Sequence, residues 1–122
     1  MKILIVDDEQ DILELMAEEF IDLGHEIELA ICGNEAIEKL KSSHFDIVLS
    51  DYMMPNGNGL TLLTYINSLA KKPIFFFASG YSEISQEECL ARGASYFFTK
   101  PFCFTEVSQK IEHFFNTRKL AE

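Results

Sequence analysis

Hydrophobic and polar positions form two kinds of segment along the chain, short apolar runs and longer stretches with helical periodicity. Five short segments rich in apolar, β-branched and aromatic residues predict β-strands: Lys2–Val6, Glu26–Ala30, Ile47–Ser50, Ile74–Ala78 and Tyr96–Thr99. Four of them are nearly continuous apolar runs, which is typical of parallel strands covered on both faces. In Glu26–Ala30 polar and apolar residues alternate instead, so we expect this strand at an edge of the sheet.

The segments between the strands have helical periodicity. The first predicted helix ends at Gly24, and its apolar stripe consists of Ile12, Leu15, Met16, Phe20 and Leu23. Asn34 is expected to cap the second helix, because a side-chain oxygen at that position accepts a bond from a free backbone N–H. A third helix is predicted over about 59–70 and a fifth over about 104–118.

The fourth predicted helix is the weakest. Its two large apolar residues, Ile84 and Leu90, are six positions apart and do not form a helical stripe. Ser85 and Glu88 have the spacing of a capping box, which would start the helix late. We therefore expect a short helix that is weakly anchored and easily displaced.

Five strand–helix repeats predict an α/β fold with a parallel sheet and right-handed crossovers. We find no linker, internal repeat or low-complexity segment, so residues 1–122 are expected to form a single domain. At 122 residues and 48% hydrophobic composition, the chain is of the globular class.

The charge of the chain narrows the range of partners. Twenty acidic and ten basic residues give a net charge of −10, which disfavours nucleic acid or an anionic membrane as a direct ligand. Twelve of the acids, and no Lys or Arg, lie between Ile3 and Glu38. The simplest interpretation of this segment is a solvated helix face.

Three widely spaced cysteines favour buried thiols in a reducing compartment over disulfides or a zinc site. The apolar runs are too short to span a membrane, and Met1 leads directly into a strand, which favours a true N-terminus. We expect a soluble, cytoplasmic protein.

The residues with candidate chemistry follow the predicted strands. Parallel strands end at one edge of the sheet, where ligands bind. The residues placed there are Asp7, Asp8, Glu9, Asp51, Ser79 and Lys100. Two carboxylates about 4 Å apart repel by roughly 4 kcal/mol at an effective dielectric of 20, so such a cluster requires a cation, and oxygen ligands favour Mg²⁺. Taken alone, the first three acids are more typical of a helix N-cap cluster, and it is the joint placement of all these residues at the strand ends that favours a site.

Asp51 is the candidate nucleophile, because it stands alone at its strand end and faces the other aspartates. A carboxylate next to a bound metal ion is suited to accepting a phosphoryl group. Lys100 and the Ser79 hydroxyl are placed to bind phosphoryl oxygens.

These residues lie in segments that resemble the receiver domains of two-component response regulators, the CheY-like superfamily. The similarity runs from Lys2 to about Arg118, and its motifs are ILIVDDE, DIVLSDYMMPNGNGL, FFFASGY and GASYFFTKPF. It implies a flavodoxin-like, doubly wound (βα)5 sandwich with strand order 2-1-3-4-5.

The resemblance also implies a role for each site residue. Asp51 matches the phosphoacceptor, and Lys100 the residue that binds the phosphoryl group. Asp8 and the backbone carbonyl of Met53 would coordinate Mg²⁺ with Asp51, and Asp7 would act largely through a metal-bound water.

A second set of implications concerns signal output. Ser79 occupies the position of the switch hydroxyl and Phe97 that of the aromatic switch, while the Lys100–Pro101 bond is expected to be cis. The implied phosphoryl donor is a sensor histidine kinase or phosphotransfer protein. The implied output is a protein partner or a homodimer, formed through helix four, strand five and helix five. Cys103 stands where a capping Asp or Ser is usual, which costs about 1 kcal/mol of stability unless Thr105 compensates.

Three alternatives remain. A magnesium-dependent phosphohydrolase with an Asp nucleophile would need a second acid two positions after it, where this chain has Met53. A flavodoxin-like mononucleotide binder would have a Ser/Thr/Gly loop after the first strand, where this chain has acids. An interaction domain that works without phosphorylation is the third.

Overall fold

The structure is a computed structural model that describes residues 1–80 and 85–121, so Ile84 lies outside the described residues. The elements in chain order are β1 (Lys2–Val6), α1 (Gln10–Asp22), β2 (Glu26–Ala30), α2 (Gly33–Ser42), β3 (Ile47–Ser50), α3 (Gly59–Asn67), β4 (Ile74–Ser79), α4 (Gln86–Ala91), β5 (Tyr96–Thr99) and α5 (Phe104–Ala121). All five predicted strands are confirmed, and β4 extends one residue further, to Ser79.

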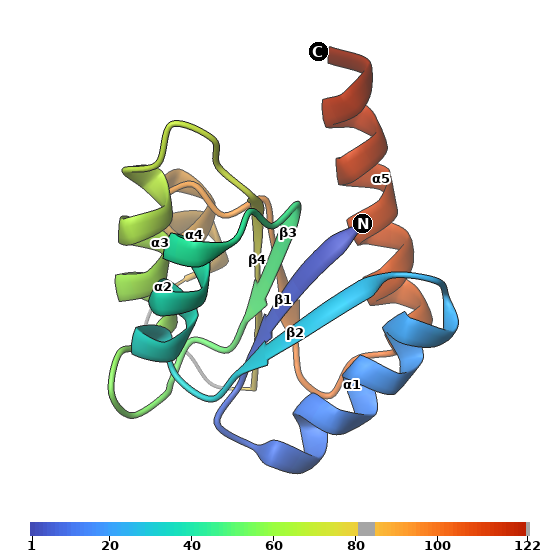
Figure 1. The fold of residues 1–122 in the computed structure, drawn as a ribbon, viewed down its shortest axis with the longest axis horizontal. Helices are drawn as coiled ribbons and strands as arrows, with labels where there is room; N and C mark the ends of the chain where they lie inside the picture. Colours follow the sequence, from blue (N-terminus) through green and yellow to red (C-terminus); the bar gives the residue numbers. More distant parts are fainter. Residues whose placement is uncertain (81–84, 122) are drawn as a thin grey trace.

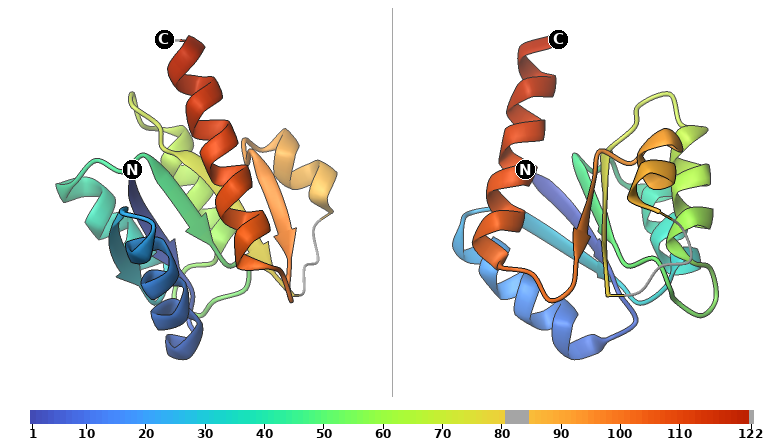
Figure 2. Two further views of the ribbon diagram at one scale, coloured as in Figure 1. Left: turned by 90° about the vertical axis from the view of Figure 1, so that its right-hand side faces the viewer. Right: turned by 180° about the vertical axis from the view of Figure 1, so that it is seen from behind.

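The strands form one parallel sheet in the order β2-β1-β3-β4-β5. The predicted flavodoxin-like order is therefore confirmed, with β2 at one edge. Helices α2, α3 and α4 cover one face of the sheet, and α1 and α5 cover the other (Figures 1 and 2).

Alternate strand residues point to opposite faces, so the sheet divides the interior into two cores. Toward α2, α3 and α4 lie Leu4, Val6, Val48, Phe75, Phe77 and Phe97. Toward α1 and α5 lie Ile3, Ile5, Ile47, Leu49, Phe76 and Phe98. Neighbouring rings within each core meet at short range: Phe75 and Phe77 lie edge to face at 4.8 Å, and Phe76 and Phe98 stack at 5.9 Å.

The predicted apolar face of α1 was partly wrong. The buried residues are Leu13, Met16, Ala17 and Phe20. Leu15 and Leu23 are instead 61% and 53% exposed. This helix carries apolar residues on several sides, and the position of the sheet decides which of them are covered.

One of the predicted caps differs from the structure. Helix α2 begins at Gly33 with Cys32 as its N-cap residue, so Asn34 lies within the first turn rather than before it. At the start of α5, the backbone N–H groups of Glu106 and Thr105 donate hydrogen bonds to the Cys103 sulfur. These contacts lower the pKa of the Cys103 thiol.

The cysteines differ in burial. Cys89 is buried, Cys32 is half-buried and Cys103 is exposed, so the expectation of three buried thiols holds for Cys89 alone.

Helix α4 is short, as predicted, and Ser85 caps it by accepting a hydrogen bond from the Glu88 N–H at 3.1 Å. It is anchored by Cys89, which is fully buried, while Leu90 is 45% exposed. At its C-terminal end, the Asn67 side chain of α3 donates to the Arg92 carbonyl at 2.7 Å.

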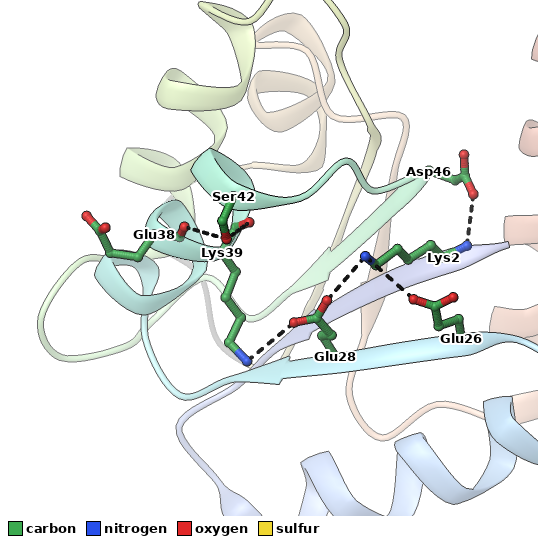
Figure 3. A network of polar contacts seen from close by, with 7 residues as sticks. All are labelled: Lys2, Glu26, Glu28, Glu38, Lys39, Ser42 and Asp46. Atoms are coloured by element: carbon green, nitrogen blue, oxygen red, sulfur yellow. Dashed lines mark hydrogen bonds and ion pairs between the residues drawn. The ribbon is translucent and has the colours of Figure 1, made fainter.

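Edge strand β2 is joined to its neighbours by charged side chains (Figure 3). Lys2 Nζ lies 3.5 Å from Glu26 and 3.4 Å from Glu28, and Lys39 of α2 lies 3.8 Å from Glu28. The Lys2 backbone N–H donates to Asp46 Oδ2 at 2.8 Å, just before β3. Each exposed pair adds little stability, and the parallel backbone pairing with β1 sets the alignment of β2.

Within residues 1–80 and 85–121, no helix combines the length and the hydrophobicity needed to cross a bilayer.

Candidate functional site

The site lies at the carboxyl edge of the sheet, where backbone bonds extend the strand pairing by one residue. The Asp7 N–H donates to the Ala30 carbonyl at 3.1 Å, the Asp51 N–H to Val6 at 2.8 Å and the Lys100 N–H to Ser79 at 3.0 Å. The sheet itself therefore fixes where these three functional side chains begin.

Three aspartates converge at this edge. One carboxylate oxygen from each of Asp7, Asp8 and Asp51 lies within 4.8 Å of the others. Asp7 and Asp51 are only 3% and 8% exposed, while Asp8 faces solvent. Backbone N–H groups orient the two buried carboxylates: Glu9 donates to Asp7 Oδ1 at 2.9 Å, and Tyr52 to Asp51 Oδ1 at 2.7 Å.

Lys100 bridges the two buried carboxylates. Its Nζ is 2.7 Å from Asp7 Oδ2 and 3.6 Å from Asp51 Oδ2. Burial lowers the pKa of Lys100, but the hydrogen bond to Asp7 and the charge of Asp51 together raise that pKa above its ordinary value. Lys100 is therefore a fixed positive charge at neutral pH.

The surroundings of Asp51 disfavour its charged form. Burial raises its pKa, and the negative charge of Asp7 adds to this effect. Lys100, a hydrogen bond from the Ser79 hydroxyl and the Tyr52 N–H act in the opposite direction, but the pKa remains above the usual value. A cation beside Asp51 would stabilise its charged form.

The donor set suits a hard divalent cation. The cavity at the site is lined by Asp8, Glu9, Asp51, Met53, Ser79, Gly80 and Lys100. Its carboxylate, hydroxyl and carbonyl oxygens are ligands that Mg²⁺ accepts. The carboxylates of Asp7, Asp8 and Asp51 together with Lys100 carry a net charge of two negative units, which one Mg²⁺ would balance.

Phe97 lies apart from the polar site. Its side chain is 9% exposed in the core beside α4, with its ring 6.0 Å from that of Phe77. The Lys100–Pro101 peptide bond is cis, as expected. The structure thus brings Asp7, Asp8, Asp51, Ser79 and Lys100 together and places Phe97 in the neighbouring core.

Some groups that shape the site were not predicted from the sequence. The Tyr52 N–H that orients Asp51 is a backbone group, and side-chain patterns do not report it. Gly33 and Asn34 contact the loop after Asp51 although they lie far from it in sequence, and the turn-rich composition of that loop was the only signal.

Comparison with known proteins identifies the family. Residues 3–112 match the response regulator receiver domain. This chain belongs to that family. The receiver is 30% identical to the transcriptional regulatory protein DltR of Streptococcus agalactiae over 91% of its own length and 50% of DltR. It spans about half the length of the curated relatives it matches.

Solved structures agree with this assignment. A CheY-like receiver domain protein from Methanospirillum hungatei is 27% identical, with a TM-score of 0.91 over 99% of this receiver and 98% of that chain. The response regulator TrrA from Thermotoga maritima, solved in complex with Mg(2+)-BeF, is 33% identical, with a TM-score of 0.82 over 92% and 96% of the two chains. The receiver is thus a signalling domain of the two-component class.

Proposed function

We propose that this receiver accepts a phosphoryl group on Asp51 in a Mg²⁺-dependent reaction and thereby changes how its α4–β5–α5 face binds a partner. The observation that carries the proposal is the convergence of Asp7, Asp8 and Asp51 with Lys100 at one edge of the sheet.

The acceptor chemistry follows from the orientation of Asp51. Its Oδ1 accepts the Tyr52 N–H, which leaves Oδ2, facing Lys100, as the attacking oxygen. Oδ2 forms a bond to the phosphorus of a phosphohistidine on a sensor histidine kinase or phosphotransfer protein. The P–N bond breaks, its electron pair stays on the imidazole nitrogen, and that nitrogen takes up a proton. The positive charge of Lys100 binds the oxygens of the transferred phosphoryl group.

The carboxylates of Asp7, Asp8 and Asp51 and the backbone carbonyl of Met53 would hold the cation, with Asp7 acting largely through water. When bound, Mg²⁺ neutralises charge on the carboxylates and on the phosphoryl oxygens. The Mg(2+)-BeF complex of TrrA, which is 33% identical, supports this proposal.

The signal would pass through Ser79. In the unphosphorylated receiver its hydroxyl bonds to the Asp51 carboxylate. A phosphoryl group adds negative oxygens there, so the hydroxyl moves to one of them, and the packing around Phe97 and the short helix α4 adjusts. The new arrangement of α4, β5 and α5 recruits a downstream protein or a second receiver. We place this exchange in the cytoplasm, with no direct contact to nucleic acid or membrane.

The proposal is tested by incubating the receiver with Mg²⁺ and acetyl phosphate and measuring its mass. We expect one added phosphoryl group in the wild type and in Asp11→Asn, a matched change on the exposed face of α1, and none in Asp51→Asn or after chelation of the metal. Equal gains in the wild type and Asp51→Asn would reject Asp51 as the acceptor.

A further arm of this experiment tests Ser79. Ser79→Ala should still gain the phosphoryl group, but hydrogen exchange in β5 and α5 should change less on phosphorylation than in the wild type. An undiminished change would remove Ser79 from the switch.

A further inference from the structure

The loop between β3 and α3, residues 51–58, presents both Asp51 and the Met53 carbonyl, and we call it the acceptor loop. Its inner end is fixed by the core. The Gly59 N–H donates to the Tyr52 carbonyl at 2.9 Å, and the Tyr52 ring lies edge to face with Phe77 at 5.8 Å. The shape of the rest of the loop depends on what holds its outer end.

The first turn of α2 holds that outer end. The Gly33 N–H donates to the Gly57 carbonyl at 2.9 Å, and the Asn34 N–H donates to the Asn56 carbonyl at 3.3 Å. The first N–H groups of a helix have no partner within the helix. The N-cap residue of α2, Cys32, makes no side-chain hydrogen bond to these N–H groups in the described part of the chain. The acceptor loop therefore supplies the capping carbonyls of α2 from a distant part of the chain.

This contact is close enough to require glycine. A Cβ added at Gly33 would lie 2.6 Å from the Gly57 oxygen, 2.9 Å from the Gly57 carbonyl carbon and 3.2 Å from the Asn58 oxygen. All three are backbone atoms, so no side-chain rotation relieves the clash. Any larger residue at position 33 must push the loop away from α2.

The loop side of the contact is equally restricted. Gly57 has φ +102°, a left-handed conformation, and a Cβ added there would lie 2.9 Å from Asn34 Oδ1 and 3.1 Å from Asn34 N. Asn56 also has a positive φ, of 56°. Two successive left-handed residues turn their carbonyls toward the N–H groups of α2.

We propose that Gly33 and Asn34 are positioning residues for phosphorylation: the first turn of α2 acts as a template that fixes the acceptor loop and so the place of the Met53 carbonyl. The proposal rests on the function proposed above. The geometry of the cation site then depends on α2, although no α2 side chain is among the described residues that line the site cavity.

The test compares Gly33→Ala with Gly24→Ala. Gly24 has φ +90°, and no described atom lies within 4 Å of an added Cβ, so this control strains the backbone at the end of α1 without touching the loop. In the metal-free proteins, amide hydrogen exchange over residues 52–58 should be several-fold faster in Gly33→Ala than in the wild type or Gly24→Ala. Calorimetric titration with Mg²⁺ alone should give a Kd about 10-fold higher in Gly33→Ala, the size typical for loss of a residue that orients a metal ligand.

Gly57→Ala serves as a second variant should Gly33→Ala fail to fold, because an added Cβ there would lie 3.1 Å from Asn34 N and would press on the same contact from the loop side. It should change both quantities in the same direction, and Gly24→Ala, which also has a positive φ, remains its control. Unaltered loop exchange or unaltered Mg²⁺ affinity in the folded variants would overturn the positioning role, even with normal phosphorylation of the wild type. A wild type that gains no phosphoryl group would instead overturn the proposed function, and the loop exchange measured without metal separates the two failures.

Discussion

Asp51 carries its charge in surroundings that oppose ionisation. The residue is buried and lies beside Asp7, and both features raise its pKa. Lys100 offsets only part of this effect, because burial is the larger cause. The acceptor residue therefore destabilises the metal-free fold at neutral pH, as is common for groups arranged for chemistry rather than for stability.

The pH dependence of the stability of the fold follows from the direction in which the pKa of Asp51 is shifted. A carboxyl group whose pKa is raised on folding holds its proton more tightly in the folded state. Its stabilising contribution is present below the ordinary pKa of aspartate and is lost as the pH rises through the raised pKa. Without Mg²⁺, Asp51→Asn should thus raise the Tm by a few degrees at pH 7.5 and by less near pH 4, as measured by calorimetry.

Asp11→Asn is the matched control for this measurement, because Asp11 lies on the exposed face of α1. Its Tm should differ little from that of the wild type at either pH. A lower Tm for Asp51→Asn at pH 7.5 would show that the Asp51 carboxylate stabilises the metal-free fold.

Most of the chemistry at this scale was predictable. Parallel strands end at one edge, so Asp7, Asp51 and Lys100 could be placed together from the strand pattern alone. The burial of Phe97 against Phe77 and the lowered pKa of the Cys103 thiol could not, because ring packing and backbone donors depend on neighbours that only the folded chain provides.

At the scale of elements, α1 shows where sequence periodicity fails. Leu13 is fully buried and Leu15 is 61% exposed, although both are leucines in one helix. Apolar residues occur around most of α1, so a stripe can be drawn along more than one side. By contrast, the short helix α4 was predictable from its lack of a stripe and from the Ser85 cap, whereas its anchor on Asn67 is a tertiary contact.

These two leucines give a matched pair for stability. Leu13→Ala should lower the free energy of unfolding by about 2–5 kcal/mol, since it leaves a cavity in the core beneath α1. Leu15→Ala should change it by less than about 0.5 kcal/mol, because the side chain is mostly in water. Urea denaturation measures both, and equal losses would contradict the observed orientation of the helix.

For the whole molecule, the net charge of −10 separates into two parts. Asp7, Asp8 and Asp51 belong to the site, where Lys100 and a cation can balance them. Much of the remainder lies on the exposed side of α1, including Asp11, Glu14, Glu18 and Asp22. Because α1 begins just after the site, this acidic side is suited to meeting a basic surface on the proposed phosphoryl donor.

Neutralising Glu14 and Glu18 together to Gln should therefore slow phosphotransfer from the cognate kinase several-fold and weaken the dependence of that rate on salt. Phosphorylation by acetyl phosphate should be unchanged, because a small donor needs no docking surface. The same charge change on α2, Glu35→Gln with Glu38→Gln, is the control. Unchanged rates with the kinase would leave the acidic side of α1 as a solvated surface only.

The phenylalanines of the adjacent strands β4 and β5 have a consequence for how the sheet finds its alignment. Residues 75–77 of β4 and 97–98 of β5 place rings of equal size on both faces. A slip of either strand by one residue would exchange one ring for another, so volume alone discriminates poorly between the native and slipped registers. Such a slip would also carry Ser79 or Lys100 about 3.3 Å along the strand and onto the opposite face. The polar residues of the proposed phosphorylation site thus also favour the native register, and replacing them should reduce the free-energy difference between the native and the slipped sheet.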